Sequence, residues 1–372
     1  MKTRLLLTPT VLSALFGALA CSEPTSPRAL SRLRADLAPA ATPSYTITDL
    51  GTLGGASADA RAINDTGQVV GASATASGDT HAFLWTSTSG MKDLGTLGGT
   101  FSRAFGINSL GHVVGVSALA SGEQRPFLWT PAGGMQDLGT FGGGFGHALS
   151  INDRGQVVGS STLPDGSVHA FLWTANQGLT DLVSLVGNNS EADGINNRQQ
   201  IVGGNGFSTQ ANQFCAFTIP FLWSASGGFR NLGELGTADP CGGAFATATN
   251  ESGLVVGLAE NDAFLTHGFR WTAESGIVDL GTLIGPNGTS VAMAVNARGQ
   301  IVGWSSAIFT APNGGGLTIH AALWDDSGIH DLGTLPGDLQ SRAHGINGTG
   351  QIVGLRLSLT LNNRAVLWTP HE

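Results

Sequence analysis

Short apolar and β-branched runs alternate with turn-forming residues along most of the chain. The stretch from Arg103 to Phe141 contains four of these runs, with the sequences RAFGIN, HVVGVSAL, RPFLWT and MQDLGTF. The breaks between runs carry Asn, Asp, Gly and Pro, as in INDRGQ and TPAGGM, where Gly can adopt a positive φ. Runs separated by turn signals roughly every 8 to 12 residues predict an all-β protein.

The same set of four runs recurs from residue 45 to residue 370. Three markers follow it: a DLG motif or a close relative such as NLG, an asparagine in an IN pair or a close relative such as TN or VN, and a tryptophan in an LW or RW pair. Each marker occurs seven times. The asparagines are spaced by 44, 44, 44, 54, 46 and 51 residues. A repeat of this length with four strands predicts a seven-bladed β-propeller with four-stranded blades. The marker asparagines are Asn64, Asn108, Asn152, Asn196, Asn250, Asn296 and Asn347.

The phase of the repeat predicts how the ring closes. The chain enters with YTITDLGTL, residues 45–53, which corresponds to the fourth run, and it leaves with RAVLWTP, residues 364–370, which corresponds to the third. We therefore expect the N-terminal strand to supply the outer strand of the last blade, which removes an open sheet edge. A linear solenoid would instead need polar caps at both ends.

The sequence LGTLGG, at residues 50–55 and again at 94–99, raises the alternative of a phosphate-binding loop. Copies of this segment recur with the repeat, and no GxxxxGK[ST] sequence accompanies them. We therefore interpret it as the connection that leaves the outer strand and turns back toward the ring axis.

Composition narrows the classes of partner. Charged residues make up 12% of the chain, the formal net charge is -9, and Lys2 and Lys92 are the only lysines. Nucleic-acid binding needs concentrated Lys and Arg, so this composition argues against it. The hydrophobic share of 41% is sufficient for a large core.

The N-terminus predicts export from the cytoplasm. Lys2 and Arg4 precede an apolar stretch that ends in small residues, which is typical of a signal peptide over residues 1–20. Cys21 follows directly and predicts a lipidated bacterial lipoprotein, with an extracytoplasmic or outer-membrane location. Ala18 stands where leucine would fit a lipoprotein signal better, so ordinary secretion is the alternative. Residues 21–44 are rich in Pro, Ser and Ala and are interpreted as a tether, and residues 45–372 as the propeller.

Several of these motifs occur together in one known family. HAFLW at residues 81–85 and 169–173, combined with DLGTLGG, the AIN and GQVVG elements and the period of 44, resembles the HAF repeat family of predicted bacterial extracellular proteins. The similarity covers roughly residues 46–370 and is weakest in the fifth unit, where HGFRW replaces HAFLW. The resemblance implies a repeat architecture outside the cell, and it supplies no catalytic or ligand-binding residues.

Length variation points to one face of the ring. It falls in the second-to-third and fourth-to-first connections, which lie on the same face of a propeller and often form its binding surface. A variable residue precedes the recurrent alanine of each first strand, and we expect these residues to surround the channel mouth. They are candidates for a site that binds a polar or anionic ligand, and a solvated rim of paired charges is the favoured interpretation. The polar members are Asp59, Arg103, His147, Glu191 and Arg342, and the others are Phe245 and Val291.

The favoured function is a binding or scaffolding module for an unknown extracellular protein or glycan, and we expect a monomer. The alternative is a secreted glycan- or ester-processing hydrolase or lyase that uses the carboxylates of Asp59, Glu191 and Asp193. No HExxH, GxSxG, calcium-loop or zinc pattern occurs, so no cofactor or metal is predicted. His81 and His169 recur with the repeat and are interpreted as structural hydrogen-bonding residues.

Cys215 and Cys241 lie in two of the longer connections on the same face. An oxidising compartment favours their pairing as a disulfide, and two buried free thiols are the alternative.

Overall fold

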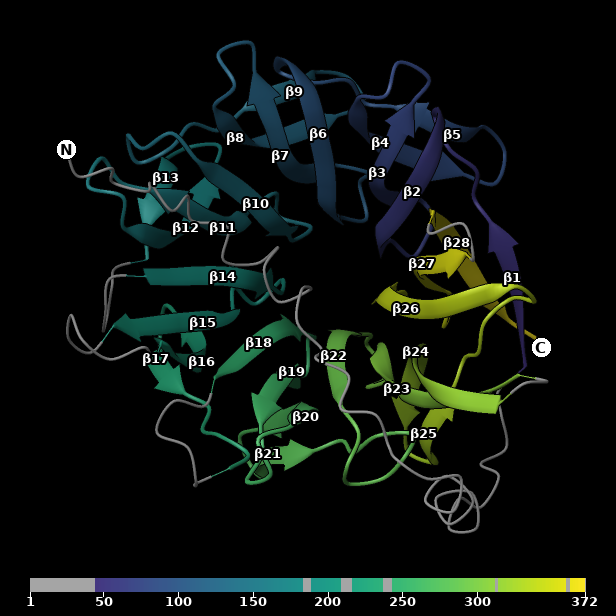
Figure 1. Ribbon diagram of the computed structural model, residues 1–372. Coiled ribbons are helices and arrows are strands. Elements are labelled where there is room, and N and C mark those ends of the chain that lie inside the picture. The colour runs from purple at the N-terminus through teal and green to yellow at the C-terminus, as the bar shows by residue number, and fades with distance from the viewer. Residues whose placement is uncertain are drawn as a thin grey trace, which may run out of the picture. The chain divides into compact units, whose positions relative to one another are not determined.

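The computed structural model describes residues 44–182, 189–208, 216–236, 243–311, 314–358 and 362–371. These residues contain 28 strands and no helix (Figure 1), so the all-β prediction is confirmed. Hence none of them forms a helix that could span a membrane. They belong to one compact unit, residues 40–372. The predicted signal peptide, Cys21, nearly all of the tether, Cys215 and Cys241 lie outside the described residues.

The strands fall into four positions that recur along the chain. The innermost strands in Figure 1 are β2 (Gly54–Ile63), β6 (Gly98–Ile107), β10 (Gly146–Ile151), β14 (Asn189–Ile195), β18 (Ala244–Thr249), β22 (Ser290–Val295) and β26 (Asp338–Ile346). The second strands are β3 (Val69–Thr75), β7 (Val113–Leu119), β11 (Val157–Thr162), β15 (Ile201–Ser208), β19 (Val255–Glu260), β23 (Ile301–Ala311) and β27 (Ile352–Ser358). The third strands are β4 (Thr80–Thr86), β8 (Gln124–Thr130), β12 (Val168–Thr174), β16 (Ala216–Ser224), β20 (Thr266–Thr272), β24 (Gly314–Asp325) and β28 (Asn363–Pro370). The outer strands are β1 (Tyr45–Asp49), β5 (Gly90–Asp93), β9 (Gly134–Asp137), β13 (Gly178–Asp181), β17 (Gly228–Asn231), β21 (Gly276–Asp279) and β25 (Gly328–Asp331).

Hydrogen bonding connects these strands into five sheets, three with four strands and two with eight. Each eight-stranded sheet is joined at its middle by a single parallel pair, Thr80↔Phe101 or Val168↔Asn189. The N-terminal strand β1 pairs antiparallel with the C-terminal strand β28, from Tyr45↔Pro370 to Asp49↔Val366.

The outer strands are shorter than the sequence suggested. The run MQDLGTF was expected to be strand throughout, but β9 ends at Asp137. An Asx turn stops it, because the Asp137 carboxylate accepts a 2.8 Å hydrogen bond from the Gly139 amide. The LGTLGG segment after Asp93 therefore contains the connection and also the start of β6 at Gly98.

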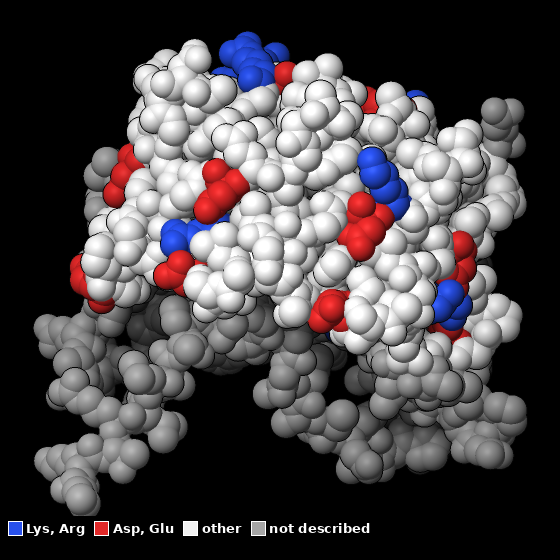
Figure 2. Space-filling view, turned by 90° about the horizontal axis from the view of Figure 1, so that it is seen from above, with Lys and Arg blue, Asp and Glu red and all other residues white. Residues whose placement is uncertain are grey.

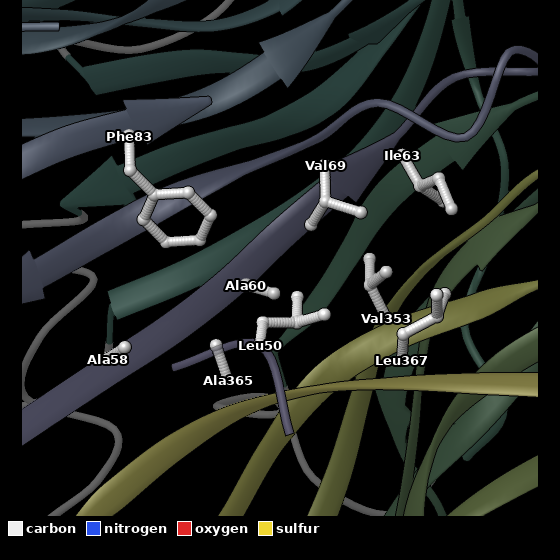
Figure 3. Close-up of a cluster of buried hydrophobic side chains, with 9 residues drawn as sticks. All are labelled: Leu50, Ala58, Ala60, Ile63, Val69, Phe83, Val353, Ala365 and Leu367. Atoms are coloured by element: carbon white, nitrogen blue, oxygen red, sulfur yellow. The ribbon is translucent and has the colours of Figure 1, made fainter. Parts of the chain in front are cut away.

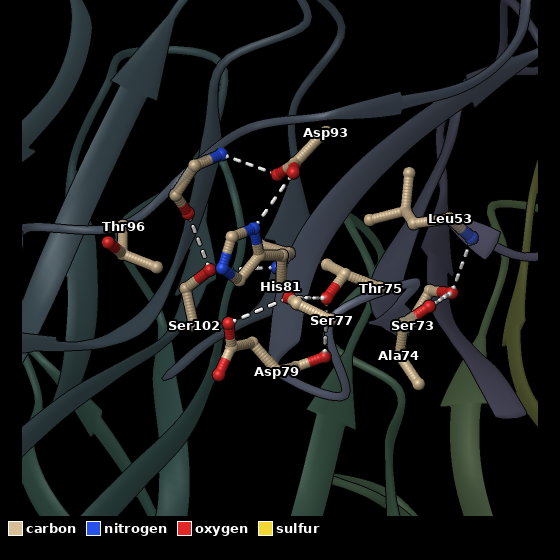
Figure 4. Close-up of polar contacts among 12 residues, drawn as sticks. Leu53, Ser73, Ala74, Thr75, Ser77, Asp79, His81, Asp93, Thr96 and Ser102 are labelled. Carbon is tan, nitrogen blue, oxygen red and sulfur yellow. Dashed lines mark hydrogen bonds and ion pairs between the residues drawn. The ribbon is translucent and has the colours of Figure 1, made fainter. Parts of the chain in front are cut away.

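The histidines of the HAF motif hold these connections to the third strands. Nδ1 of His81 lies 2.8 Å from Oδ2 of Asp93 (Figure 4), and the other oxygen of Asp93 accepts the Gly95 amide at 2.7 Å. Equivalent pairs join His169 to Asp181, His267 to Asp279 and His320 to Asp331. The contacts are structural, as the recurrence of His81 and His169 predicted.

Side chains of the third strands alternate between two neighbouring cores. Phe83 is fully buried and packs with Val353 and Leu367 of β27 and β28 (Figure 3), whereas Leu84 packs in the next cluster along the chain. The cluster in Figure 3 therefore joins β2, β3 and β4 of the first repeat to β27 and β28 of the last. The buried Phe, Leu and Trp residues supply the hydrophobic contact between sheets, as the FLW pattern indicated.

A closed cycle of hydrogen bonds connects the seven marker asparagines. Each side-chain amide donates to the main-chain carbonyl of the next marker at 2.9 to 3.1 Å, and Asn347 donates to Asn64. The side-chain oxygen of each marker accepts amides two and four residues ahead, as Asn64 does from Thr66 and Gln68. One asparagine therefore stabilises its own turn and bonds to the neighbouring repeat.

Candidate ligand-binding site on the inner strands

Two rows of variable residues flank the recurrent alanines of the inner strands. The alanines are completely buried in the hydrophobic clusters between neighbouring sheets. We call the residues before them the upstream row: Asp59, Arg103, His147, Glu191, Phe245, Val291 and Arg342. We call the residues after them the bulge row: Arg61, Phe105, Leu149, Asp193, Thr247, Met293 and His344.

Every residue of the bulge row coincides with a shift in strand register. In the first unit Ala60 pairs with Gly71 and Ala62 with Val70, so Arg61 is an extra residue on β2. Such β-bulges bend a strand and redirect a side chain. They bring the upstream and bulge rows close enough for their side chains to form ion pairs.

The glycine of the VVG motif makes room for this bulge. A Cβ on Gly115 would lie 1.9 Å from the Arg103 carbonyl oxygen, and a Cβ on Gly203 would lie 2.0 Å from that of Glu191. The equivalent glycines of the other repeats show the same close approach. Only glycine therefore permits the second strand to approach the residue that carries the site side chain.

Three arginines gather around Asp59 where β2, β6 and β26 lie next to one another. Nη2 of Arg61 lies 2.6 Å from one carboxylate oxygen of Asp59, and Nδ1 of His344 lies 3.2 Å from the other. Arg103 and Arg342 interact electrostatically with Asp59 from the neighbouring strands. We call Arg61, Arg103 and Arg342 the arginine group.

The positive charges of the arginine group lie close enough to affect one another's pKa. Burial lowers the pKa of Arg103 and the Arg61 guanidinium lowers it further, whereas Asp59 raises it. Burial alone would raise the pKa of Asp59, but Arg61, His344 and Arg103 hold it far below its usual value. Asp59 is therefore ionised, but its single charge cannot neutralise both Arg61 and Arg103.

Two members of the arginine group have unused donors. The Nε atoms of Arg61 and Arg103 are buried and have no hydrogen-bond partner. Within the described part of the chain, no hydrogen bond or ion pair is formed by Arg103. Arg342 lies over the indole of Trp304 on β23, with its guanidinium carbon 5.4 Å from the ring centroid. A buried donor without a partner is costly, so an acceptor that reached these donors would be favoured.

A second polar group lies on β10, β11 and β14. Nε2 of His147 lies 3.1 Å from Oε2 of Glu191, and the hydroxyl of Ser160 lies within 3.1 Å of both atoms. Asp193 follows Glu191 by two residues and interacts with its charge. Oε1 of Glu191 and Oδ2 of Asp193 are buried and accept no hydrogen bond.

The pKa values of the two carboxyl groups in this second group are shifted in opposite directions. Burial raises the pKa of Asp193 well above its usual value, and the Glu191 charge raises it further. Burial also opposes ionisation of Glu191, but His147 and Ser160 lower its pKa overall. Asp193 therefore retains its proton to a higher pH than Glu191 does.

The predicted site residues thus separate into two groups. Asp59, Arg103 and Arg342 lie together, and His147 and Glu191 lie together. The interpretation as a rim of paired charges holds for Asp59, which pairs with Arg61, and for Glu191, which pairs with His147. It does not hold for Arg103, which has no ion pair with a described residue. The three carboxylates considered for catalysis do not converge, because Asp59 pairs with Arg61 and His344.

Sequence reasoning named Asp193 as a candidate carboxylate but did not select the bulge row as a set, although its signal was present. Arg61, Asp193 and His344 occupy the position after each recurrent alanine, and the VVG glycine indicates the bulge. Among the described residues, no group of three or more His, Cys, Asp or Glu side chains could hold a metal ion.

Charged side chains are sparse on one outer face of the molecule. Figure 2 shows scattered basic and acidic side chains, several of them next to a side chain of opposite charge, on a mostly uncharged surface. The clustering of charge on the inner strands therefore differs from the distribution on this face.

Structural comparison identifies the class of fold as a β-propeller. The chain is similar to the β-propeller domain of the Trilobed protease from Pyrococcus furiosus, described as having an open velcro topology, with a TM-score of 0.58 and 10% identity over 85% of this chain and 96% of that one. It is also similar to a puromycin-hydrolyzing peptidase of Mycobacterium tuberculosis, with a TM-score of 0.56 and 9% identity over 88% of this chain. A puromycin hydrolase matches with a TM-score of 0.54 and 12% identity over 86% of this chain.

The chain spans only 52% of each of the two puromycin-hydrolysing proteins. No protein-family model matches the sequence, and no curated protein sequence is similar to it. At these identities the similarity establishes the propeller fold alone.

Proposed function

We propose that this protein is an extracytoplasmic, seven-bladed β-propeller that binds an anionic ligand on its inner strands. The observation that carries the proposal is the arginine group, in which Arg103 is partly buried and has no ion pair with a described residue. Burying a charge without a partner costs free energy, so a charge that is kept in this state often has a role such as ligand binding. Extracellular glycans and proteins with acidic groups are ligands of suitable chemistry.

Three observations support seven closed, four-stranded blades. Each eight-stranded sheet is joined at one residue pair, which divides it into two groups of four strands. The seven marker asparagines form a closed cycle of hydrogen bonds. Asp49 of β1 also forms ion pairs with Arg356 and Arg364 of the last repeat, at 2.9 and 3.1 Å.

The extracytoplasmic location rests on residues 1–21 of the sequence. If Cys21 is lipidated, globomycin causes a precursor to accumulate and Cys21→Ser releases the protein from membranes. Processing that is unchanged in both experiments supports ordinary secretion instead.

A binding screen of the mature protein tests the function. The wild type and Arg103→Gln are compared on glycan arrays and by thermal shift against acidic metabolites. We expect acidic ligands that bind the wild type and lose affinity in the variant. The proposal fails if no acidic ligand depends on Arg103.

A second candidate function is hydrolase or lyase activity. The observation that favours it is the pair of Glu191 and Asp193, because environments that separate two carboxyl pKa values are typical of acid–base catalysis. Turnover of a glycan or ester substrate that is lost in both Glu191→Gln and Asp193→Asn would establish an enzyme and replace the binding proposal.

A further inference from the structure

The arginine group also indicates which kind of anion it binds. We infer that it takes a phosphoryl or sulfo group, with three terminal oxygens, in preference to a carboxylate; this inference rests on the proposed function. The proposed anion site lies where β2, β6 and β26 are next to one another.

The arrangement of the donors is the first argument. The guanidinium groups come from three adjacent strands, and none lies on the same strand as another. A carboxylate offers two oxygens in one plane and is matched by a single guanidinium fork. Three groups from separate strands instead suit a tetrahedral anion, which presents its oxygens in several directions.

The anchoring of each arginine is the second argument. Asp59 holds Arg61 at 2.6 Å, and the Trp304 ring lies beneath Arg342. Both side chains are therefore fixed before a ligand arrives, which lowers the entropic cost of binding. Arg103 brings a charge without an ion pair among the described residues, and its buried Nε atom is free to donate.

Charge is the third argument. Asp59 already offers a carboxylate to the arginine group, and its one charge leaves Arg103 and Arg61 repelling each other. A phosphoryl group, with a charge of about -2 at pH 7, would reduce this repulsion more than a second carboxylate would, and a sulfo group would spread its one charge over three oxygens.

Isothermal titration with sodium sulfate, sodium phosphate and sodium acetate at matched ionic strength tests the inference. We expect sulfate and phosphate to bind saturably and at least about ten-fold more tightly than acetate. Arg103→Gln should weaken sulfate binding at least ten-fold, and Arg103→Lys should weaken it less because it keeps the charge and loses the fork. The exposed Arg270, changed to Gln, is the matched control and should bind like the wild type.

The outcomes separate the inference from the proposed function. If acetate binds as tightly as sulfate and Arg103→Gln weakens both, the preference for three oxygens is wrong and anion binding stands. If sulfate binds Arg103→Gln and the wild type equally, the site is elsewhere and the inference is wrong. If no anion or acidic ligand binds the folded wild type, the proposed function fails as well. Circular dichroism of each variant confirms that it is folded.

Discussion

Asn347 donates a 3.1 Å hydrogen bond from its side-chain amide to the main-chain carbonyl of Asn64, which lies 283 residues earlier. Both residues are almost completely buried. The bond has the same geometry as those between successive markers, such as the 3.1 Å bond from Asn108 to Asn152. The first and last repeats are therefore held together by the contact that joins consecutive repeats.

Removal of this side chain should destabilise the domain. In Asn347→Ala the Asn64 carbonyl loses its donor, and the amides of Thr349 and Gln351 lose their acceptor. Because these groups are buried or partly buried, we expect a loss of at least about 2 kcal/mol in the free energy of unfolding. Urea denaturation measures it, and Asn287→Ala, at an exposed turn, should change stability by less than about 0.5 kcal/mol. An equal effect of the two substitutions would contradict the role of the cycle.

Substitution of a VVG glycine should be more damaging than its exposure suggests. In Gly115→Ala the new methyl group would meet the Arg103 carbonyl at 1.9 Å, and the two strands would have to separate. We expect a loss of about 1 to 3 kcal/mol, typical of overpacking, and weaker anion binding, because Arg103 moves. Gly144→Ala is the control, since a methyl group at that position would have no atom within 4 Å. Thermal unfolding and sulfate titration of both variants measure the two effects.

The sequence predicted the repeat and the propeller because both depend on local patterns. Alternation in FLW, turn residues after the marker asparagines and buried alanines such as Ala104 are each visible within one unit. The pairing of β1 with β28 followed from the phase of the repeat.

The site was harder to predict, because its contacts join residues of different repeats. Sequence position gave Asp59 and Glu191, but their partners His344 and His147 lie on other strands. The β-bulge also places Arg61 beside Asp59. The alternation of side chains along a regular strand does not reveal how far a bulge redirects one of them. Spacing alone therefore found one row and not the contacts between the two rows.

The His267–Asp279 pair should make stability depend on pH. Both ring nitrogens of His267 face acceptors, Oδ2 of Asp279 at 2.8 Å and the Gly288 carbonyl at 3.2 Å. The hydrogen bond to Asp279 raises the pKa of His267, although burial opposes the increase. A raised folded-state pKa gives stability that is fully present below the unfolded value of about 6.5 and is lost as pH rises through the folded value.

We therefore expect His267→Gln to cost more stability at pH 6 than at pH 8.5, as measured by urea denaturation. An NMR titration of His267 should give a pKa above that of an unfolded peptide containing the same residue. A difference in stability that grows between pH 6 and pH 8.5 would contradict the assignment.

Asp193 should limit the stability of the wild-type protein at neutral pH. Burial raises its pKa well above the usual value, and Glu191 raises it further, so the folded state must keep a proton that the unfolded state releases. This requirement costs free energy once pH exceeds the unfolded pKa of about 3.9, and the cost increases until pH reaches the folded value.

Asp193→Asn keeps the shape of the protonated carboxyl group without that cost. We expect the variant to be more stable than the wild type at pH 7, by about 1 kcal/mol or more, with little difference at pH 3.5. Denaturant unfolding at the two pH values measures this, and a variant that is less stable at pH 7 would show that the carboxyl group contributes to folding. A stabilised variant would indicate that Asp193 is retained for a role other than stability, as polar residues at functional sites often are.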